Sequence, residues 1–131
     1  MKGLVIAALT AGLAGTSLWS AAQSEPHPAG LEIYQEYCMA CHMANGQGVT
    51  GVYPPLAGAD YLLDKPEQAA RAIKYGLNGP ITVNGQIYNT SMANPGLDDE
   101  EVVAVMNYIL QSWGNESDFV ATQDWVSQIK P

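Results

Sequence analysis

The sequence "CMACH" at residues 38–42 contains both cysteines of a 131-residue chain and one of its two histidines. A redox-active pair of cysteines usually lies in a sequence that alternates between strands and helices, and this pattern is absent here. A structural zinc site needs four ligands, typically two such pairs or one pair plus two histidines. In C-x-x-C-H, however, both thiols add to the vinyl groups of haem and the adjacent imidazole binds the iron. We therefore expect Cys38 and Cys41 to carry haem c covalently and His42 to be the proximal iron ligand.

The N-terminus predicts export. Lys2 precedes the apolar run GLVIAALTAGLAGTSLW, which is shorter than the roughly 20 residues of a membrane span. Ser20-Ala21-Ala22 has the small residues of a signal-peptidase site, so residues 1–24 are predicted to be a signal peptide. The expected location is the periplasm, without stable membrane insertion after cleavage, and an uncleaved anchor is the alternative. Disulfides form outside the inner membrane, so a plain bridge between the two cysteines also stays open.

Residues 25–131 are expected to form one haem-binding domain, and this domain is acidic. All 13 acidic residues but only four of the five basic ones lie in it, so its formal charge is near −9. Nucleic acid is not expected as a partner, because phosphate binding requires clustered lysine and arginine. A redox protein with a basic docking surface is the expected partner.

Two helices are predicted in the first half of this domain. One runs into Cys38, and its buried face is formed by residues at helical spacing, namely Gly30, Ile33, Tyr34 and Tyr37. The other is DKPEQAARAIKYG at residues 64–76, with Asp64 as its N-cap, Pro66 in its first turn and Gly76 at its end.

The strongest helix signal is LDDEEVVAVMNYILQSWGN at residues 97–115. Asp98 is a good N-cap with Glu101 three residues later, as in a capping box, and Gly114 is placed to end the helix. Its apolar stripe is formed by Val102, Val105, Met106, Ile109 and Trp113. We expect this helix to pack its stripe against the core.

A short hairpin is predicted before that last helix. Ile81 and Val83 alternate ahead of Asn84-Gly85, a strong two-residue turn signal. The hairpin leads to Met92, close to the start of the capped helix. A haem with a proximal histidine has either an open face or a sixth ligand, and a methionine thioether is a good ligand because soft sulfur raises the reduction potential.

Met92 is the expected sixth ligand because the other candidates are poorly placed. Met39 lies inside the attachment motif and Met43 directly follows the proximal histidine, so neither easily reaches the opposite face of a haem. Met106 belongs to the apolar stripe, where methionine usually fills the core. His27 is the one other imidazole and lies near a proline-flanked N-terminus.

The order of helix, CMACH, proline turn, helix, hairpin with methionine and capped helix resembles class I cytochrome c over nearly all of residues 25–131. The resemblance implies an all-α fold, in which three main helices, shorter ones and long loops surround one covalently bound haem. Gly30 and Tyr34 match the N-terminal helix of the family, and Val105 and Tyr108 match its C-terminal helix. The two helices are therefore expected to cross in contact at Gly30. More narrowly, the chain looks like the small cytochrome c domains that accompany periplasmic nitrite reductases and quinoprotein dehydrogenases, including their short terminal helix.

The resemblance also implies residues around the haem. Pro54 in "PPL" matches the proline whose carbonyl accepts a hydrogen bond from the ring N–H of the proximal histidine, with Pro55 as the alternative. Leu56 of the same motif is expected to contact the cofactor. Tyr53 and Tyr88 lie in loops beside the expected haem, where they are either core residues or hydrogen-bond partners of a propionate.

With both axial positions filled, the iron has no site for a substrate. The predicted function is therefore that of a periplasmic mono-haem c-type cytochrome that transfers single electrons between redox partners, with no catalytic residues. One alternative is a haem-c subunit fixed in a larger oxidoreductase complex. A gas-binding or peroxidatic haem protein is the other, if Met92 does not bind. One departure from the family pattern is that Ala93, rather than proline, follows Met92, which predicts a less rigid loop.

Overall fold

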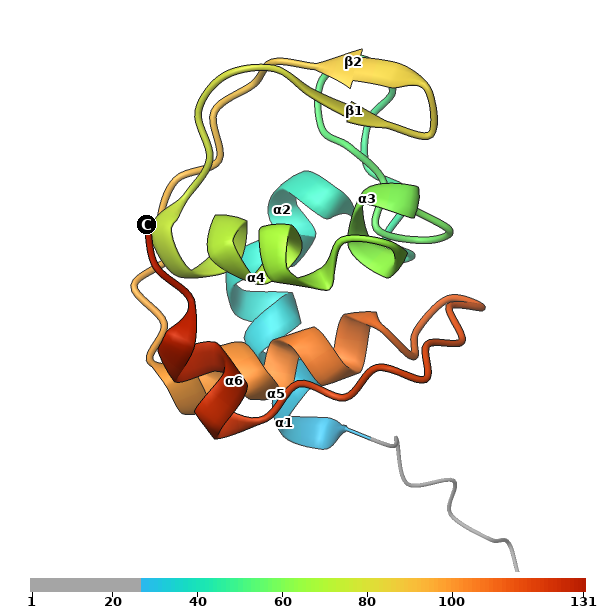
Figure 1. Ribbon diagram of the computed structural model, residues 1–131. Coiled ribbons are helices and arrows are strands. Elements are labelled where there is room, and N and C mark those ends of the chain that lie inside the picture. The colour runs from blue at the N-terminus through green and yellow to red at the C-terminus, as the bar shows by residue number, and fades with distance from the viewer. Residues whose placement is uncertain (1–26) are drawn as a thin grey trace, which may run out of the picture.

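The computed structural model describes residues 27–131, so the predicted signal peptide at 1–24 lies outside the described residues. The elements in chain order are α1 (Pro28–Ile33), the π-helical turn η1 (Tyr34–Cys38), α2 (Met39–His42), α3 (Asp60–Leu63), α4 (Pro66–Tyr75), β1 (Ile81–Val83), β2 (Gln86–Tyr88), α5 (Asp99–Ile109) and α6 (Gln123–Gln128). Figure 1 shows the hairpin of β1 and β2 at one end of the molecule, α1, α5 and α6 at the other, and α2 and α4 between them. The three main helices are the continuous helix formed by α1, η1 and α2, helix α4 and helix α5. This arrangement confirms the predicted fold. Among the residues described, no helix combines the length and apolarity needed to cross a membrane.

The N-terminal helix crosses α5 in direct contact at Gly30. A Cβ built on Gly30 would overlap the carbonyl oxygen of Ala104 and lie 2.5 Å from the Cβ of Tyr108. Glycine inside a helix costs about 1 kcal/mol relative to alanine, and this close approach explains its presence. Tyr34 packs its ring on Tyr108 and Trp113, with centroid distances of 5.6 and 4.9 Å. The predicted crossing of the two helices is confirmed.

A π-helical turn interrupts the N-terminal helix just before the two cysteines. The amide of Met39 donates to the carbonyl of Tyr34, five residues back, whereas an α-helix pairs residues four apart. The wider turn rotates the following residues about the helix axis relative to a regular helix. Tyr37, predicted to lie on the buried face with Gly30, is therefore 45% exposed, and that prediction was wrong. Cys38 packs against the core instead.

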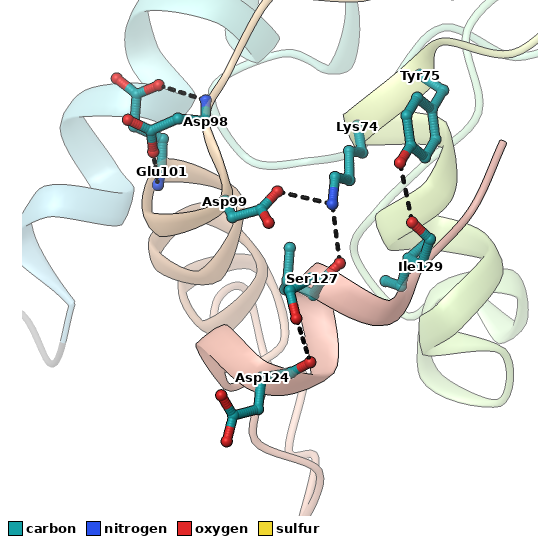
Figure 2. A network of polar contacts seen from close by, with 9 residues as sticks. Lys74, Tyr75, Asp98, Asp99, Glu101, Asp124, Ser127 and Ile129 are labelled. Atoms are coloured by element: carbon teal, nitrogen blue, oxygen red, sulfur yellow. Dashed lines mark hydrogen bonds and ion pairs between the residues drawn. The ribbon is translucent and has the colours of Figure 1, made fainter.

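Helix α5 begins as predicted but ends earlier. Asp98 Oδ1 accepts the N–H of Glu101, and Glu101 Oε2 accepts the N–H of Asp98, both at 2.9 Å (Figure 2). This reciprocal capping box confirms the predicted start. The helix ends at Ile109, before the predicted stop at Gly114, and Trp113 lies beyond it with a φ of 55°. Trp113 is therefore not part of the apolar stripe of α5, contrary to the prediction. Its ring packs on Tyr34 of the N-terminal helix, and its Nε1 donates to the carbonyl of Ala44 in the loop after α2.

The start of α4 corrects a second detail. Asp64 was predicted to be its N-cap, but Asp64 ends α3 with helical φ and ψ of −91° and −19°, and its amide donates to the carbonyl of Asp60. An N-cap residue needs non-helical backbone angles, so Asp64 is not the N-cap of α4. The N-cap is Lys65, whose side chain makes no capping hydrogen bond. Pro66 in the first turn and the end of the helix at Gly76, with a φ of 81°, are both confirmed.

The hairpin forms at the predicted turn. Asn84 and Gly85 both have positive φ, 50° and 79°, which is typical of a two-residue turn between paired strands. The turn is also tied to the start of α3. Asp60 Oδ1 accepts the N–H of Asn84 at 2.8 Å, and Asn84 Oδ1 accepts the N–H of Asp60 at 2.9 Å.

The predicted terminal helix is α6, and it packs at the junction of α4 and α5. Lys74 Nζ lies 2.7 Å from Asp99 Oδ1 and donates to the carbonyl of Val126 at 2.9 Å (Figure 2). The hydroxyl of Tyr75 donates to the carbonyl of Ile129 at 2.9 Å. These contacts fix the C-terminal end of α4, from which the chain continues toward the hairpin.

Candidate cofactor site

A deep apolar cavity lies between α2, α4, α5 and the loops on either side of the hairpin. It encloses about 630 Å³ of space, part of which is open to solvent. Its lining includes Cys38, His42, Leu56 and Met92. A second, wider cleft shares Cys38, His42 and Met92 with the cavity and extends to the surface.

His42 is held on one wall of the cavity in a defined orientation. Its Nδ1 lies 2.9 Å from the carbonyl oxygen of Pro54, so of the two prolines considered, Pro54 makes this contact. A carbonyl only accepts hydrogen bonds, so Nδ1 carries the proton, and in the neutral ring Nε2 keeps its lone pair. Burial lowers the pKa of His42, and the hydrogen bond to Pro54 opposes this shift. A buried, neutral imidazole with a free Nε2 is the form that binds a metal.

The two cysteines lie at the mouth of the cavity. They are not joined by a disulfide, and Cys38 lines both the cavity and the outer cleft, whereas Cys41 lines the outer cleft. Burial, with a smaller contribution from Cys41, raises the pKa of Cys38 to about 11. Within residues 27–131, no group of three or more His, Cys, Asp or Glu side chains is placed to hold a metal ion.

Met92 lines the same cavity as His42, and its backbone is fixed to the end of α4. The N–H of Met92 donates to the carbonyl of Leu77 at 2.9 Å, and the N–H of Leu77 donates to the carbonyl of Met92 at 2.8 Å. Gly76 permits this pairing, because a Cβ there would lie 2.8 Å from the Met92 carbonyl oxygen. The pairing restrains the loop at the position where the family pattern has proline and this chain has Ala93.

The other candidate ligands lie elsewhere. Met106 is fully buried in the hydrophobic core and does not line the cavity. Met39 is 38% exposed, and Met43 turns away from α2 with a φ of 65°. His27 precedes the first turn of α1, outside both the cavity and the outer cleft. Met92 therefore lines one cavity with Cys38 and His42, and its role as a ligand stays a prediction.

The remaining predicted contacts divide between the two parts of the site. Leu56 lines the inner cavity, whereas Tyr53 and Tyr88 line the outer cleft. Tyr88 is buried against the core and Tyr53 is half-buried. Tyr53 and Tyr88 therefore border the wider cleft rather than the inner cavity.

One residue behind the site was missed by the sequence reasoning. Asn115 is 3% exposed, and its amide bonds the backbone of the loop that contains Pro54 and Leu56. An asparagine after a glycine is an ordinary turn signal, so the sequence alone did not distinguish it.

The donors on this cavity fit a flat, largely apolar macrocycle with a metal at its centre. Two thiols lie at the cavity mouth, while an imidazole and a thioether lie on walls that are otherwise mostly apolar. A small helical fold around such a cavity, with C-x-x-C-H at its mouth, defines a c-type haem protein. A family model described as cytochrome c matches residues 28–113, and the chain belongs to the cytochrome c family. Its cofactor is covalent haem c, and its function is electron transfer.

The relatives include a cytochrome c-552 and cytochrome c subunits of dehydrogenases. Cytochrome c-552 of Thermus thermophilus is 43% identical over 91 residues, which cover 66% of this chain and 69% of that protein. The cytochrome c subunit of the quinone alcohol dehydrogenase of Gluconobacter oxydans (strain 621H) is 35% identical over 94 residues, 68% of this chain and 19% of that protein. The cytochrome c subunit of gluconate 2-dehydrogenase of Pantoea cypripedii is 26% identical over 118 residues, 87% of this chain and 26% of that protein. The chain spans 61% of a second cytochrome c-552 of Thermus thermophilus.

Proposed function

We propose that this chain is a periplasmic mono-haem electron carrier in which Cys38 and Cys41 hold haem through thioether bonds and His42 and Met92 are the axial iron ligands. The observation that carries the proposal is that Met92 lines the same apolar cavity as His42 and Cys38, while the other methionines within residues 27–131 do not. When bound, haem supplies a one-electron couple, and the chain supplies the ligands and the apolar surroundings that set its potential.

The ligand side chains come from restrained segments. The carbonyl of His42 accepts the N–H of Gly48 at 3.0 Å, and its ring is held by Pro54 at 2.9 Å. Met92 is paired with Leu77 by two backbone hydrogen bonds. These restraints would keep both ligands in place if a bound iron changed charge, so the chain would need little rearrangement. Cys38 and Cys41 would hold the group beside the outer cleft, where a redox partner could exchange electrons with it.

The filled axial positions favour a carrier over an enzyme. A substrate or gas molecule would have to displace Met92, whose backbone is anchored at the end of α4. The acidic cluster at residues 98–101 already has a structural use, because Asp98 and Glu101 cap α5 and Asp99 pairs with Lys74. None of these carboxylates is needed as a general acid or base.

The surface around the outer cleft suits a basic partner. Glu36 and Tyr37 lie on its rim, and Glu36, with a smaller contribution from Glu101, raises the pKa of Tyr37. Two of the basic residues are already paired with carboxylates, Arg71 at 3.1 Å and Lys74 at 2.7 Å. A redox partner with lysine or arginine around its own redox centre would therefore be attracted, and this attraction weakens with salt.

Haem attachment is the first experimental test. The mature protein should keep haem through acid acetone extraction and denaturing electrophoresis, and its mass should equal the chain from about residue 25 plus one haem. Free extraction of haem, or a mass that corresponds to a Cys38–Cys41 disulfide, contradicts the proposal. A mass that retains residues 1–24 contradicts the cleaved signal and supports a membrane anchor.

The relatives that are dehydrogenase subunits favour a second candidate function, a cytochrome fixed in a larger oxidoreductase. Purification at low salt separates the two. A carrier elutes alone with the mass of a single small domain, whereas a fixed subunit elutes with its enzyme.

A further inference from the structure

Two polar side chains are buried in the part of the chain that the structure describes, His42 at 9% exposure and Asn115 at 3%. The role of His42 follows from its place in the C-x-x-C-H segment. Asn115 lies beyond the end of α5, far from that segment in the sequence. A buried polar group is costly unless it is fully hydrogen-bonded, so its partners indicate what it does.

Asn115 joins the end of α5 to the loop that follows Pro54. Its Oδ1 accepts the N–H of Gly58 at 2.7 Å, and its Nδ2 donates to the carbonyl of Leu56 at 3.0 Å. The same Nδ2 donates to the carbonyl of Ile109 at 2.8 Å. One amide therefore satisfies three backbone groups and fixes residues 56–58 against the last turn of α5.

The restraint on residues 56–58 reaches His42 through a short, stiff segment. Leu56 is separated from the Pro54 carbonyl only by Pro55, and the ring of each proline fixes its own φ. The N–H of Leu56 also donates to the carbonyl of Gly46 at 2.7 Å, so both sides of the loop are tied down. The Pro54 carbonyl at the far end of this segment accepts from Nδ1 of His42 at 2.9 Å.

We propose that Asn115 is a positioning residue for the proximal histidine: it fixes residues 56–58 and thereby holds the Pro54 carbonyl on Nδ1 of His42. The proposal rests on the proposed function, because it takes His42 to be an iron ligand. A carbonyl that accepts a hydrogen bond from the ring nitrogen that does not bind the metal orients a ligating histidine and increases its basicity. Loosening this carbonyl should make His42 a weaker donor, destabilise the oxidised iron relative to the reduced iron, and raise the potential.

The chain contains a matched control on α5, the helix that ends shortly before Asn115. Asn107 of α5 makes a comparable pair of hydrogen bonds with Ala121. Its Nδ2 donates to the Ala121 carbonyl at 3.0 Å, and its Oδ1 accepts the N–H of Ala121 at 2.8 Å. These bonds tie down the segment before α6 and do not touch residues 54–58. Asn107→Ala therefore removes an amide from α5 and lowers stability without affecting the loop behind His42.

The test compares Asn115→Ala with Asn107→Ala in the intact haem protein. Solvent exchange of the His42 Nδ1 proton is measured by NMR in the reduced state, together with the reduction potential and the stability. In Asn115→Ala, the exchange should accelerate by about tenfold or more, since the hydrogen bond that protects the proton opens more often. The reduction potential should rise, so that at a fixed applied potential the ratio of reduced to oxidised protein increases about threefold. At ~59 mV per tenfold change in this ratio, the rise is about 28 mV. Asn107→Ala should be destabilised while exchange and potential stay at parental values.

Equal exchange rates and potentials in the two variants would overturn the proposal and leave Asn115 as a structural residue. If Asn115→Ala does not mature, the exchange rates of the His42 Nδ1 proton in Asn115→Asp and Asn107→Asp are compared, because aspartate keeps the shape and the acceptor and loses the amide donor. The potentials of these two variants are not compared, since the added carboxylate lowers the potential by itself. A parental protein in which His42 shows no sign of iron ligation would instead overturn the proposed function, so the two failures are distinguishable.

Discussion

Replacing Met92 by alanine separates an electron carrier from a haem protein with an open iron. The change removes the thioether but leaves the main-chain pairing of Met92 with Leu77, because both hydrogen bonds involve backbone groups. Haem should stay attached through Cys38 and Cys41, and the fold should persist. Loss of the soft ligand should lower the potential by a substantial part of the roughly 0.8 V range that axial ligands control. The reduced variant should bind carbon monoxide, which the parent should resist.

Met106→Ala is the matched control, because it removes the same side chain from the core instead of the cavity. Met106 is fully buried on α5, and its neighbours Val102, Val105 and Leu110 are fully buried too. A cavity left among such residues can close only partly, so the cost should be about 2–5 kcal/mol. For a domain of about 100 residues, this lowers the melting temperature by roughly 10 °C or more. The optical spectrum and the potential should not change.

The assay is an absorption spectrum of each oxidised variant, a carbon monoxide titration of each reduced variant and a thermal melt. Met92→Ala should lose the weak far-red band of iron–sulfur ligation, and Met106→Ala should keep it. A band that survives Met92→Ala and disappears in Met106→Ala would refute the ligand assignment and the reading of the cavity on which it rests.

Three further predictions concern stability. Gly30→Ala should lower the melting temperature, because the new Cβ overlaps the rigid carbonyl of Ala104. This overlap costs about 1–3 kcal/mol or more, which exceeds the gain of about 1 kcal/mol in helix propensity. A higher melting temperature would contradict the crossing in Figure 1. Asp98→Ala should cost about 0.5–2 kcal/mol in chemical unfolding through loss of the capping box, with an unchanged spectrum as the sign that the haem site is not involved. The double variant Cys38→Ser, Cys41→Ser, made without haem, should be largely unfolded by circular dichroism, since the apolar residues that line the cavity would then lack the cofactor they pack against. Near-native helicity would count against this.

Features that depend on local sequence were predictable. The capping box at Asp98 and Glu101, the turn at Asn84-Gly85 and the end of α4 at Gly76 each depend on backbone angles and short-range hydrogen bonds. The C-x-x-C-H segment is likewise local, because the chemistry of attachment requires these residues at this spacing.

Features that depend on distant parts of the chain were not predictable. The π-helical turn exposes Tyr37, and nothing in the helical spacing of the N-terminal segment indicates an extra residue in that turn. The early end of α5 comes from the packing of Trp113 on an aromatic ring at the other end of the chain. Asn115 and the pairing of Leu77 with Met92 each act across many residues, so their contribution to the site appears only in the folded chain.

The optical spectrum of the purified parent protein, in both redox states and with carbon monoxide added to the reduced form, tests the central claim most directly. The proposed ligands predict the bands of covalently bound haem, a weak far-red iron–sulfur band in the oxidised state, and no change on addition of carbon monoxide. Haem bands without the far-red band, together with carbon monoxide binding, would contradict Met92 ligation and the carrier function that depends on it.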